Sequence, residues 1–493
     1  MESITIYKID EIYMKIVGER SVLQDISEEF TFFADNYKFM KKYKSGIWDG
    51  KIRLLNPLNG RLYVGLLHRL FKVCKELDYK VKFDNISDFS LNQLSIEDVK
   101  DFIQNINLPF SPREYQVNSL YDCIQKKRLV VLSPTGSGKS LIIYMFIRWF
   151  LSQHPNEKMM LIVPNVSLVH QIYNDFEDYS SDNLWDVEKF CQKIYSGQEK
   201  LVEKNVAITT WQSIYRLPPS YFKAYRGVIV DEAHQAKASS LTNILGKMRY
   251  AEYRIGTTGT LDDINVHQLT LEGLFGVVRN HVTTKKLIDD NYLSDFKIKF
   301  ITLKYPEDEC KEVCKMDYVD EIDFILDHPK RNKFIKNLCG HLKGNTLVLY
   351  TYVEKHGDLL SEILEELPDK EVFYIHGKID AKIREKVRKK VEDMDNALIL
   401  ASYGTFSTGI NIKNLHNVIF ASPTKSKIRS LQSIGRGLRL GDDKESCILF
   451  DLCDDFSFKK KTNYMIKHGT ERMKIYIKED FEIESVTVSF TEN

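Results

Sequence analysis

Residues 133–140 have the side-chain types and the spacing that suit a loop for binding phosphate groups. The segment reads Ser-Pro-Thr-Gly-Ser-Gly-Lys-Ser, and it separates an apolar run, residues 129–132, from a stretch with helical spacing, residues 141–150. Gly136 and Gly138 allow backbone N–H groups to turn toward phosphate oxygens, and a helix that begins after the loop adds unpaired donors. A strand, a loop and a helix in this order predict a nucleotide site.

The loop also supplies a cation and a hydroxyl for ATP and its Mg²⁺. Lys139 is predicted to neutralise the β- and γ-phosphates, and Ser140 to contribute its hydroxyl to Mg²⁺. Ser133 stands where the general pattern has glycine, and a small side chain should still fit there. A flexible solvated loop is the alternative interpretation. The predicted ATP-binding residues of the loop are Pro134, Thr135, Gly136, Ser137, Gly138, Lys139 and Ser140.

Two carboxylates follow another apolar run further along the chain. Residues 227–230, Gly-Val-Ile-Val, lead directly into Asp231-Glu232-Ala233-His234. An apolar strand of the same sheet would deliver both acids beside the phosphate loop. Asp231 is then expected to hold Mg²⁺ through water, and Glu232 to orient or activate the attacking water. The alternative, a solvated charged loop, agrees less well with the apolar strand before it.

From residue 129 onward, short apolar runs alternate with longer stretches that have helical spacing. The runs are rich in Val, Ile, Leu or aromatic residues, whereas stretches such as residues 379–392 repeat with a helical period. Strands that alternate with helices form parallel sheets with both faces covered. The alternation weakens over residues 280–327, which places a boundary between two α/β units there.

Residues 1–105 lack this alternation and contain strand-like pieces and turns, which indicates a separate small α+β domain. The predicted fold class is therefore α/β, with two parallel-sheet domains in tandem after that domain. The predicted divisions are residues 1–105 for a basic nucleic-acid-binding domain, 106–285 and 286–455 for the two α/β domains, and 456–493 for a basic C-terminal tail.

The N-terminal domain concentrates positive charge that the whole chain does not show. Between Lys38 and Lys75 there are ten Lys and Arg residues and one acid, Asp49, so the local charge is 10 − 1 = +9, against +1 overall. Basic residues neutralise phosphates, and the interleaved aromatic rings can stack on exposed bases. A small domain with aromatics in its core and lysines on its solvated face remains the alternative. The predicted DNA contacts are Lys41, Lys42, Lys44, Trp48, Lys51 and Arg53.

Composition and cysteine usage favour a globular protein inside a cell. The chain has 493 residues, of which 43% are hydrophobic and 28% charged, and its eight cysteines are scattered without a C-x-x-C pair. Cys310 and Cys314 lack a second pair or nearby histidines, so a helix face explains their spacing better than zinc does. Neither a signal pattern nor a long uncharged apolar run is present. We expect reduced thiols and a cytoplasmic location.

The order of the motifs resembles that of superfamily 2 helicases and translocases. Gly-Ser-Gly-Lys-Ser is followed by Asp-Glu-Ala-His, and Thr258-Gly259-Thr260 stands where the family has Ser/Thr-Ala-Thr. The resemblance implies two RecA-like domains, adenine contacts, contacts to the DNA backbone and a coupling motif. The residues at those positions are Arg113 and Gln116 for adenine, Pro164, Asn165, Thr210, Trp211 and Gln212 for DNA, and His234, Thr258 and Thr260 for coupling.

The second α/β domain contains two further motifs of this superfamily. Residues 407–411, Ser-Thr-Gly-Ile-Asn, resemble the motif that faces both ATP and nucleic acid, and Gly409 and Asn411 are expected to contact ATP. Residues 431–439 resemble the arginine-finger motif Q-x-x-G-R-x-x-R, with Gln432, Arg436 and Arg439 as catalytic residues. Such fingers contribute about 10³- to 10⁵-fold in rate in NTPases. A surface salt-bridge cluster is the alternative for the arginines.

Residues 43–54 and 63–66 closely resemble the N-terminal domain of UvsW-type phage recombination helicases. With Asn165, Trp211 and the Ser402-Tyr403-Gly404 segment, the resemblance extends over nearly the whole chain, and it adds Ser402 to the expected DNA contacts. It implies an ATP-dependent DNA helicase, with DNA recombination, repair and replication roles, that unwinds or branch-migrates forks, Holliday junctions and R-loops. For a phage protein, the location would be the host cytoplasm, and replication or recombination proteins are possible partners.

Other functions remain compatible with the same motifs. The Asp-Glu-Ala-His motif does not separate a DNA track from an RNA track, so an RNA helicase or an RNA–protein remodelling ATPase is the main alternative. A nucleic-acid switch that binds ATP without moving is a second alternative, against which the complete set of hydrolysis residues argues. A nuclease-coupled motor is a third, and no additional carboxylate and lysine constellation in the sequence supports it.

Overall fold

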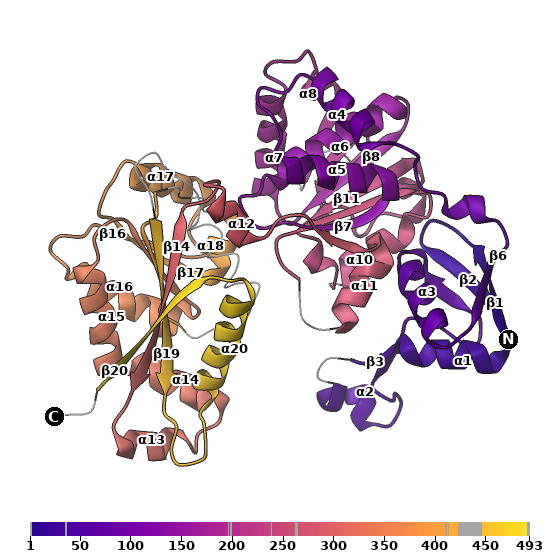
Figure 1. The fold of residues 1–493 in the computed structure, drawn as a ribbon. Coiled ribbons are helices and arrows are strands. Elements are labelled where there is room, and N and C mark those ends of the chain that lie inside the picture. Colours follow the sequence, from indigo (N-terminus) through magenta and orange to yellow (C-terminus); the bar gives the residue numbers. More distant parts are fainter. Residues whose placement is uncertain are drawn as a thin grey trace. The chain divides into compact units, whose positions relative to one another are not determined.

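The computed structural model describes residues 2–34, 37–195, 197, 200–237, 239–261, 265–409, 412, 414–422 and 446–490. The chain divides into two compact units, residues 1–133 with 138–281 and residues 134–137 with 282–493 (Figure 1). The first unit holds the N-terminal domain and the first α/β domain, and the second unit holds the second α/β domain.

The N-terminal domain is a mixed sheet with helices, as the sequence predicts. In the described residues its main sheet has the order β5-β2-β1-β6, where β1 (Ser3–Lys8) runs antiparallel to β2 (Tyr13–Val17) and parallel to β6 (Lys80–Phe83). Alternate residues of β1 and β2 are buried under α1 (Arg20–Glu29) and α3 (Leu67–Glu76), because successive side chains of a strand point to opposite faces. The short strand β5 (Arg61–Tyr63) completes the sheet.

A small hairpin subdomain extends from this core. Strands β3 (Thr31–Phe33) and β4 (Lys51–Arg53) pair antiparallel, and the chain between them forms η1 (Tyr37–Phe39), α2 (Lys41–Lys44) and a turn. Figure 1 shows α2 at one end of the first unit, apart from the main sheet of the N-terminal domain. The hairpin is joined to that core by buried Leu55, whose carbonyl oxygen accepts a hydrogen bond from Ser27 Oγ.

The first α/β domain is built on a parallel sheet. Its described strands have the order β13-β7-β12-β11-β8-β10-β9, and every pairing between them is parallel. The bounds are β7 (Arg128–Leu132), β8 (Lys158–Val163), β9 (Cys191–Ile194), β10 (Val206–Thr210), β11 (Tyr225–Asp231), β12 (Tyr253–Thr258) and β13 (Val278–Asn280). Parallel pairing brings all the carboxyl ends to one edge, where the predicted motifs lie.

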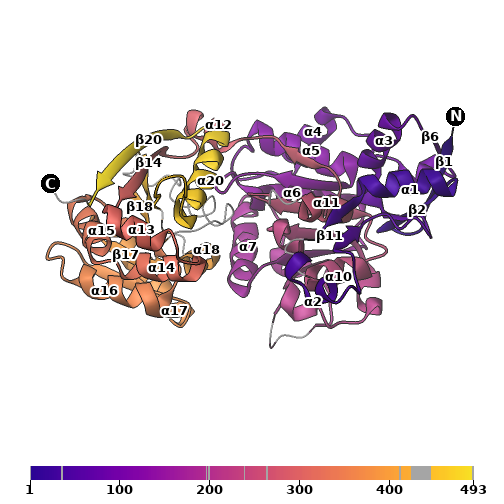
Figure 2. The same cartoon turned by 90° about the horizontal axis from the view of Figure 1, so that it is seen from below.

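Helices cover both faces of this sheet, so its strands are apolar on both sides. Figure 2 shows α4 (Ile96–Asn105) and α5 (Glu114–Lys126) on one face and α10 (Ser239–Lys247) on the other. The helices α6 (Lys139–Gln153) and α7 (Val166–Tyr179) contribute to the first layer and α11 (Asn265–Phe275) to the second. Val99 and Ile103 of α4 belong to this core, although the predicted boundary at residue 105 assigns them to the N-terminal domain.

The second α/β domain repeats the architecture. Its described strands have the order β16-β17-β15-β18-β19-β14-β20, again with parallel pairing throughout. The bounds are β14 (Asp295–Lys304), β15 (Thr346–Tyr350), β16 (Val372–Ile375), β17 (Leu398–Ser402), β18 (Asn417–Phe420), β19 (Ser446–Asp455) and β20 (Glu482–Ser489). The main helices are α13 (Glu307–Val313), α14 (Tyr318–Asp327), α15 (Pro329–His341), α16 (Asp358–Glu365) and α17 (Ala381–Glu392).

The C-terminal residues differ from the basic tail that the sequence predicts. Residues after 456 form α20 (Tyr464–Lys478) and β20, and β20 pairs along its whole length with β14. Buried Arg472 of α20 donates to Asp451 of β19, so this helix is part of the domain. The lysines suggest a tail only because they lie on the exposed loop and faces of these elements.

Two further expectations concern the state of the cysteines and membrane-spanning helices. All eight cysteines, including Cys310 and Cys314, are buried, and no disulfide joins any of them in the described residues. Within the described part of the chain, no helix has both the length and the apolar character needed to cross a membrane.

Candidate nucleotide site and nucleic-acid surfaces

The phosphate loop connects β7 to α6 with the geometry that its glycines permit. Gly136 has φ +84° and Gly138 has φ +77°, both in the left-handed region that residues with a side chain adopt at a cost. Ser137 Oγ donates to Pro134 O at 2.7 Å, and Lys139 Nζ donates to Ser133 O at 3.1 Å. The loop is therefore folded on itself, with the Lys139 ammonium group lying across it.

The turn before α5 meets this loop. Gln116 is almost fully buried, and its side-chain oxygen accepts from the Arg113 backbone N–H at 2.8 Å. The amide nitrogen of the same side chain lies only 2.4 Å from where a Cβ on Gly138 would stand. The structure thus brings Gln116 against the phosphate loop, and Arg113 donates to Tyr115 Oη nearby. The adenine contacts of Arg113 and Gln116 stay a prediction.

Asp231 lies at the carboxyl end of β11, where parallel pairing places it opposite Thr257 of β12. Its carboxylate accepts a 2.7 Å hydrogen bond from Thr257 Oγ1. Burial and the adjacent charge of Glu232 raise the pKa of Asp231, whereas the charge of Lys139 and the Thr257 hydrogen bond lower it. Ser133 N donates to Thr258 O of β12 at 2.9 Å, and β12 pairs with β11, so the phosphate loop and the acidic motif begin at the same edge of the sheet.

Glu232 and His234 connect the acidic motif to the coupling motif. Glu232 has φ +52°, a strained conformation for a residue with a side chain. His234 Nδ1 lies 3.2 Å from Glu232 Oε2 and 3.0 Å from Thr258 Oγ1. Thr258 Oγ1 donates to Thr260 O at 2.8 Å, so it accepts from His234, which assigns the imidazole proton to Nδ1. The predicted coupling residues are joined in one network.

The residues predicted to hold Mg²⁺ have suitable donor atoms. Ser140 Oγ hydrogen-bonds to Tyr179 Oη at 2.8 Å, and burial raises the pKa of Tyr179 to about 12, so the phenol stays neutral. A hydroxyl and a carboxylate are hard oxygen donors, and Mg²⁺ commonly combines one or two carboxylates with substrate phosphates. In the described residues no group of three His, Cys, Asp or Glu is arranged as a metal cage. This set therefore fits a nucleotide-bound Mg²⁺.

Five residues predicted to contact DNA lie at the carboxyl ends of β8 and β10, which are paired neighbours. Asn165 caps α7 by accepting from Leu168 N at 3.0 Å, and exposed Gln212 donates to Pro164 O at 3.1 Å. Trp211 begins the short helix α9 (Trp211–Ile214). Thr210 is buried, with its hydroxyl bonded to Ser213 Oγ, so its side chain positions the loop and is not on the surface.

The N-terminal basic residues are divided between surface and framework. Lys41, Lys42 and Lys44 are exposed on α2, which is compatible both with the predicted DNA contacts and with the alternative of a solvated face. Trp48 is only partly exposed, and its indole N–H donates to Lys51 O at 2.9 Å, so the ring helps to hold the hairpin. Arg53 pairs with Asp49 at 2.5 Å, and this hydrogen bond lowers the pKa of Asp49 to about 2.

In the second unit the structure describes only part of the predicted site. Ser402 ends β17, and its hydroxyl bonds to Thr405 Oγ1 at 2.8 Å in a buried position. Gly409 ends α18 (Tyr403–Gly409). The remaining predictions of the second domain, Asn411, Gln432, Arg436 and Arg439, lie outside the described residues.

Sequence reasoning missed residues that support this site. Thr257, which bonds to Asp231, and Tyr179, which bonds to Ser140, come from neighbouring elements. The strand order reveals Thr257, because Asp231 and Thr257 are register partners only once β11 and β12 are known to be adjacent.

Comparisons with known proteins identify the class of protein. Residues 109–263 match the family described as the res subunit of type III restriction enzymes, and residues 329–441 match the helicase conserved C-terminal domain. Residues 4–84 match the N-terminal domain of DNA helicase UvsW. Two tandem parallel-sheet domains with these motifs define a superfamily 2 helicase.

The chain is 31% identical to the ATP-dependent DNA helicase uvsW of Enterobacteria phage T4, over 97% of this chain and 98% of that protein. The crystal structure of T4 UvsW matches 99% of this chain and 100% of that chain, with a TM-score of 0.53 and 29% identity. A fragment of a putative type I restriction enzyme HsdR subunit from Vibrio vulnificus YJ016 shares the fold, with a TM-score of 0.58 at 17% identity, over 86% of this chain and 74% of that chain. The chain belongs to the UvsW family of DNA helicases.

Proposed function

We propose that this chain hydrolyses ATP to move on DNA, and that it unwinds or branch-migrates forks, Holliday junctions and R-loops. The observation that carries the proposal is the network from Lys139 through Asp231 to His234 and Thr258, at one edge of one sheet, in a member of the UvsW family. The matched relative is a phage DNA helicase, which supports a role in recombination, repair and replication in the cytoplasm of a host cell.

The described residues divide the work of hydrolysis between them. Lys139 would exchange its bond to Ser133 O for phosphate oxygens, and Glu232, whose Oε2 lies 3.2 Å from His234 Nδ1, would orient the attacking water. Mg²⁺, when bound, neutralises phosphate charge, and Ser140 and Asp231 are the residues that would hold it. His234 contacts Glu232 and Thr258 at once, so a change at the γ-phosphate can reach the coupling motif.

The remaining roles are proposed from the motifs. Gly409 and Asn411 are assigned to ATP, Gln432, Arg436 and Arg439 to catalysis, and Ser402 to DNA. Lys41, Lys42 and Lys44 on the exposed face of α2, with the edge formed by Pro164, Asn165, Trp211 and Gln212, are proposed to bind the track. Replication or recombination proteins are proposed as further partners.

The test compares nucleic-acid substrates under identical conditions. ATP hydrolysis and strand release are measured with forked DNA, a Holliday junction, an R-loop, linear duplex DNA and single-stranded RNA, for wild type and Lys139→Ala. We expect strongest turnover and ATP-dependent resolution with branched DNA, and loss of both in Lys139→Ala with DNA binding largely retained. Stimulation by RNA alone would assign the chain to RNA remodelling, and normal turnover in Lys139→Ala would refute the nucleotide site.

A further inference from the structure

The hairpin subdomain carries a group of apolar side chains that its own fold leaves in solvent. Ile47 is 80% exposed and Phe39 is 75% exposed, and Phe33 and Met40 are also exposed. We call these four residues the apolar tip. Single exposed apolar residues are ordinary, but several within one short subdomain mark a surface that contacts something.

The framework under the apolar tip is ordered and specific. Tyr37 stacks on Phe33 with ring centroids 4.6 Å apart and meets Tyr43 edge-on at 4.8 Å. Gly50 has φ +79°, and a Cβ there would stand 2.4 Å from the Tyr37 ring, so only glycine allows this packing. These contacts hold Phe33 in place, and backbone bonds from Met40 N to Tyr37 O and from Trp48 N to Lys42 O fix the chain beside Phe39 and Ile47.

The charge around the tip indicates which partner it meets. Lys38, Lys41, Lys42 and Lys44 are exposed in the same subdomain. Its sequence between β3 and β4 contains two acids, Asp35 and Asp49, and the carboxylate of Asp49 pairs with Arg53. A lipid or protein surface has no fixed arrangement of apolar area and negative charge, so it does not account for an apolar group with lysines around it. A flat apolar face flanked by regularly spaced phosphates is the end of a base-paired stack, and basic residues around an apolar wedge complement it.

The N-terminal domain is firmly attached to the first α/β domain through α11. Glu272 of α11 is buried and accepts two hydrogen bonds from Arg69, at 2.5 and 2.7 Å, while His68 lies 3.1 Å away. A Cβ on Gly65 would stand 2.1 Å from Glu272 O, so the two backbones touch directly. The same helix contacts β3 of the hairpin and η5 (Ala233–Lys237), which carries His234.

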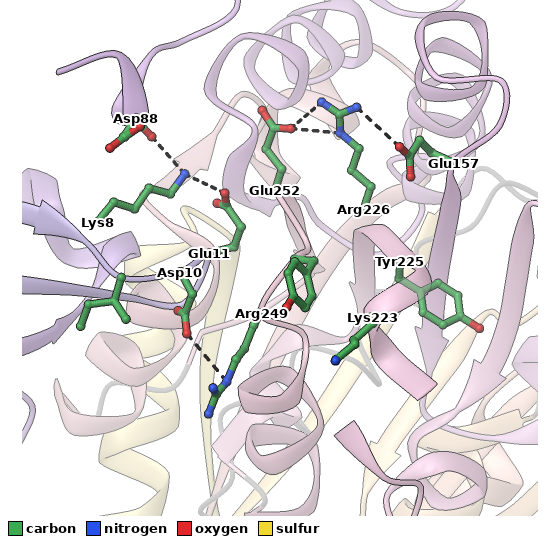
Figure 3. Close-up of a pocket in the computed structure, with 12 residues that line it drawn as sticks. Lys8, Asp10, Glu11, Asp88, Glu157, Lys223, Tyr225, Arg226, Arg249 and Glu252 are labelled. Atoms are coloured by element: carbon green, nitrogen blue, oxygen red, sulfur yellow. Dashed lines mark hydrogen bonds and ion pairs between the residues drawn. The ribbon is translucent and has the colours of Figure 1, made fainter. Parts of the chain in front are cut away.

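A second seam joins the same two domains away from α11. The groove of about 760 Å³ in Figure 3 is lined by opposite charges that satisfy one another: Asp10 pairs with Arg249, and Arg226 pairs with Glu252. Arg128 also pairs with Glu11 at 2.7 Å. Since most of its charges are paired across or along the boundary between the domains, this groove is better explained as part of the attachment than as a ligand site. The apolar tip thus moves with the domain that carries the phosphate loop and the acidic motif.

We infer that the apolar tip, chiefly Phe39 and Ile47, stacks on the terminal base pair at the branch point of DNA and separates the strands as the first α/β domain advances. This inference rests on the proposed function, because it needs a motor on branched DNA. Lysines of the hairpin subdomain hold the phosphates of the diverging strands. The two attachments between the N-terminal domain and the first α/β domain, at α11 and at the groove, transmit the force. Without the tip, the chain would still move on DNA but would separate strands poorly.

The test replaces Phe39 and Ile47 together by alanine, with Leu58→Ala/Ile86→Ala as the matched control. The control residues are 83% and 72% exposed in the same domain but lie outside the hairpin between β3 and β4, so both pairs remove similar apolar area at little cost to folding. Measurements are ATP turnover on single-stranded DNA, unwinding of a fork, and the fluorescence of 2-aminopurine in the branch-point base pair without ATP. Ile47→Leu tests whether apolar bulk alone suffices.

We expect Phe39→Ala/Ile47→Ala to unwind forks about tenfold more slowly, or worse, with turnover on single-stranded DNA within about twofold of wild type. The 2-aminopurine response to binding should disappear in this variant and persist in the control and in Ile47→Leu. Unwinding and fluorescence equal to wild type would overturn the inference while leaving the motor intact. If DNA did not change the rate of ATP turnover of the wild-type chain, the proposed function would be wrong, and this inference with it.

Discussion

Gly138 shows how one residue ties the adenine-contact turn to the phosphate loop. Its φ of +77° and the nearby Gln116 amide both exclude a side chain. We expect Gly138→Ala to lower stability by about 1–3 kcal/mol and to weaken ATP binding, because either the loop or Gln116 must move. Thermal unfolding and nucleotide titration measure both effects.

The control for Gly138 is Gly246→Ala. Gly246 lies in α10, and a Cβ there would meet nothing within 4 Å, so alanine should be neutral or stabilising by about 0.5–1 kcal/mol. If Gly138→Ala behaved like Gly246→Ala, the close packing of Gln116 on the loop would be wrong.

The hydrogen bond from Thr257 to Asp231 makes a prediction about pH. This bond lowers the pKa of Asp231, so its removal in Thr257→Val raises that pKa further above the usual value of a carboxyl group. If hydrolysis needs Asp231 ionised, the acid limb of the pH–rate profile must move to higher pH. Thr257→Ser, which keeps the hydroxyl, should restore the limb, and an unmoved limb in Thr257→Val would exclude this role of Asp231.

At the scale of single residues, the residues that do the chemistry could be predicted from the sequence better than the residues that position them. Lys139, Asp231 and His234 follow from local patterns, because a strand, a glycine loop and a helix have few alternative arrangements. Thr257 depends on strand order, which a local pattern does not contain. The bond from the Trp48 N–H to Lys51 O could not be predicted either, because it exists only after the hairpin has folded, and the predicted DNA contact of Trp48 stays a prediction.

Helix α11 is the element whose contacts hold the N-terminal domain in place. Burial raises the pKa of Glu272, but hydrogen bonds from Arg69 and His68 outweigh it and hold the pKa below its usual value. The carboxylate therefore stabilises the fold at neutral pH, and this contribution is lost as pH falls through the lowered pKa. Arg69→Ala leaves a buried carboxylate short of partners and should cost about 1–3 kcal/mol.

The matched control for Arg69 is Lys72→Ala on the same helix. Lys72 is 75% exposed and its contact with Glu76 is 3.8 Å, so the expected change is within about 0.5 kcal/mol. Hydrogen exchange in α3 and α11 separates loosened docking, expected for Arg69→Ala, from general unfolding. Equal protection in the two variants would show that the Arg69 pair does not hold the domains together.

The C-terminal strand is the element that sequence reasoning described least well. β20 is an edge strand in which only Ile483, Val486 and Val488 are partly buried, so its pattern is weak and its lysine-rich surroundings resemble a tail. Its Val486 and Val488 nevertheless pack against the core of the second α/β domain. Three partly buried residues that do not alternate are too few for a periodic signal.

Deletion of residues 481–493 tests whether β20 is structural. Removing it exposes the backbone groups of β14 along the pairing from Lys297 to Lys304, which creates a free edge. We expect a lower unfolding temperature of the second unit and concentration-dependent aggregation. A variant that ends at residue 490 keeps the strand and should behave as wild type. Equal stability of the two truncated chains would favour a dispensable tail.

For the whole molecule, the arrangement of charge matters more than its total. A net charge of +1 gives no general attraction to DNA, so affinity must come from local patches such as Lys41, Lys42 and Lys44 on α2. Each phosphate that a lysine neutralises adds about 0.9 to the slope of log K against log salt on duplex DNA. Replacing all three by alanine should therefore flatten the slope by up to about 2.7.

The control triple, Lys459→Ala/Lys460→Ala/Lys461→Ala, removes the same charge from an exposed loop of the second α/β domain, which the proposal does not place on the track. Its slope should equal that of wild type, since only phosphates bound by the changed lysines contribute. ATP turnover at saturating DNA should be similar in both triples, because neither touches the Lys139–Asp231 network. Equal flattening in the two triples would mean that DNA responds to total charge, and α2 would then lose its assignment as part of the track.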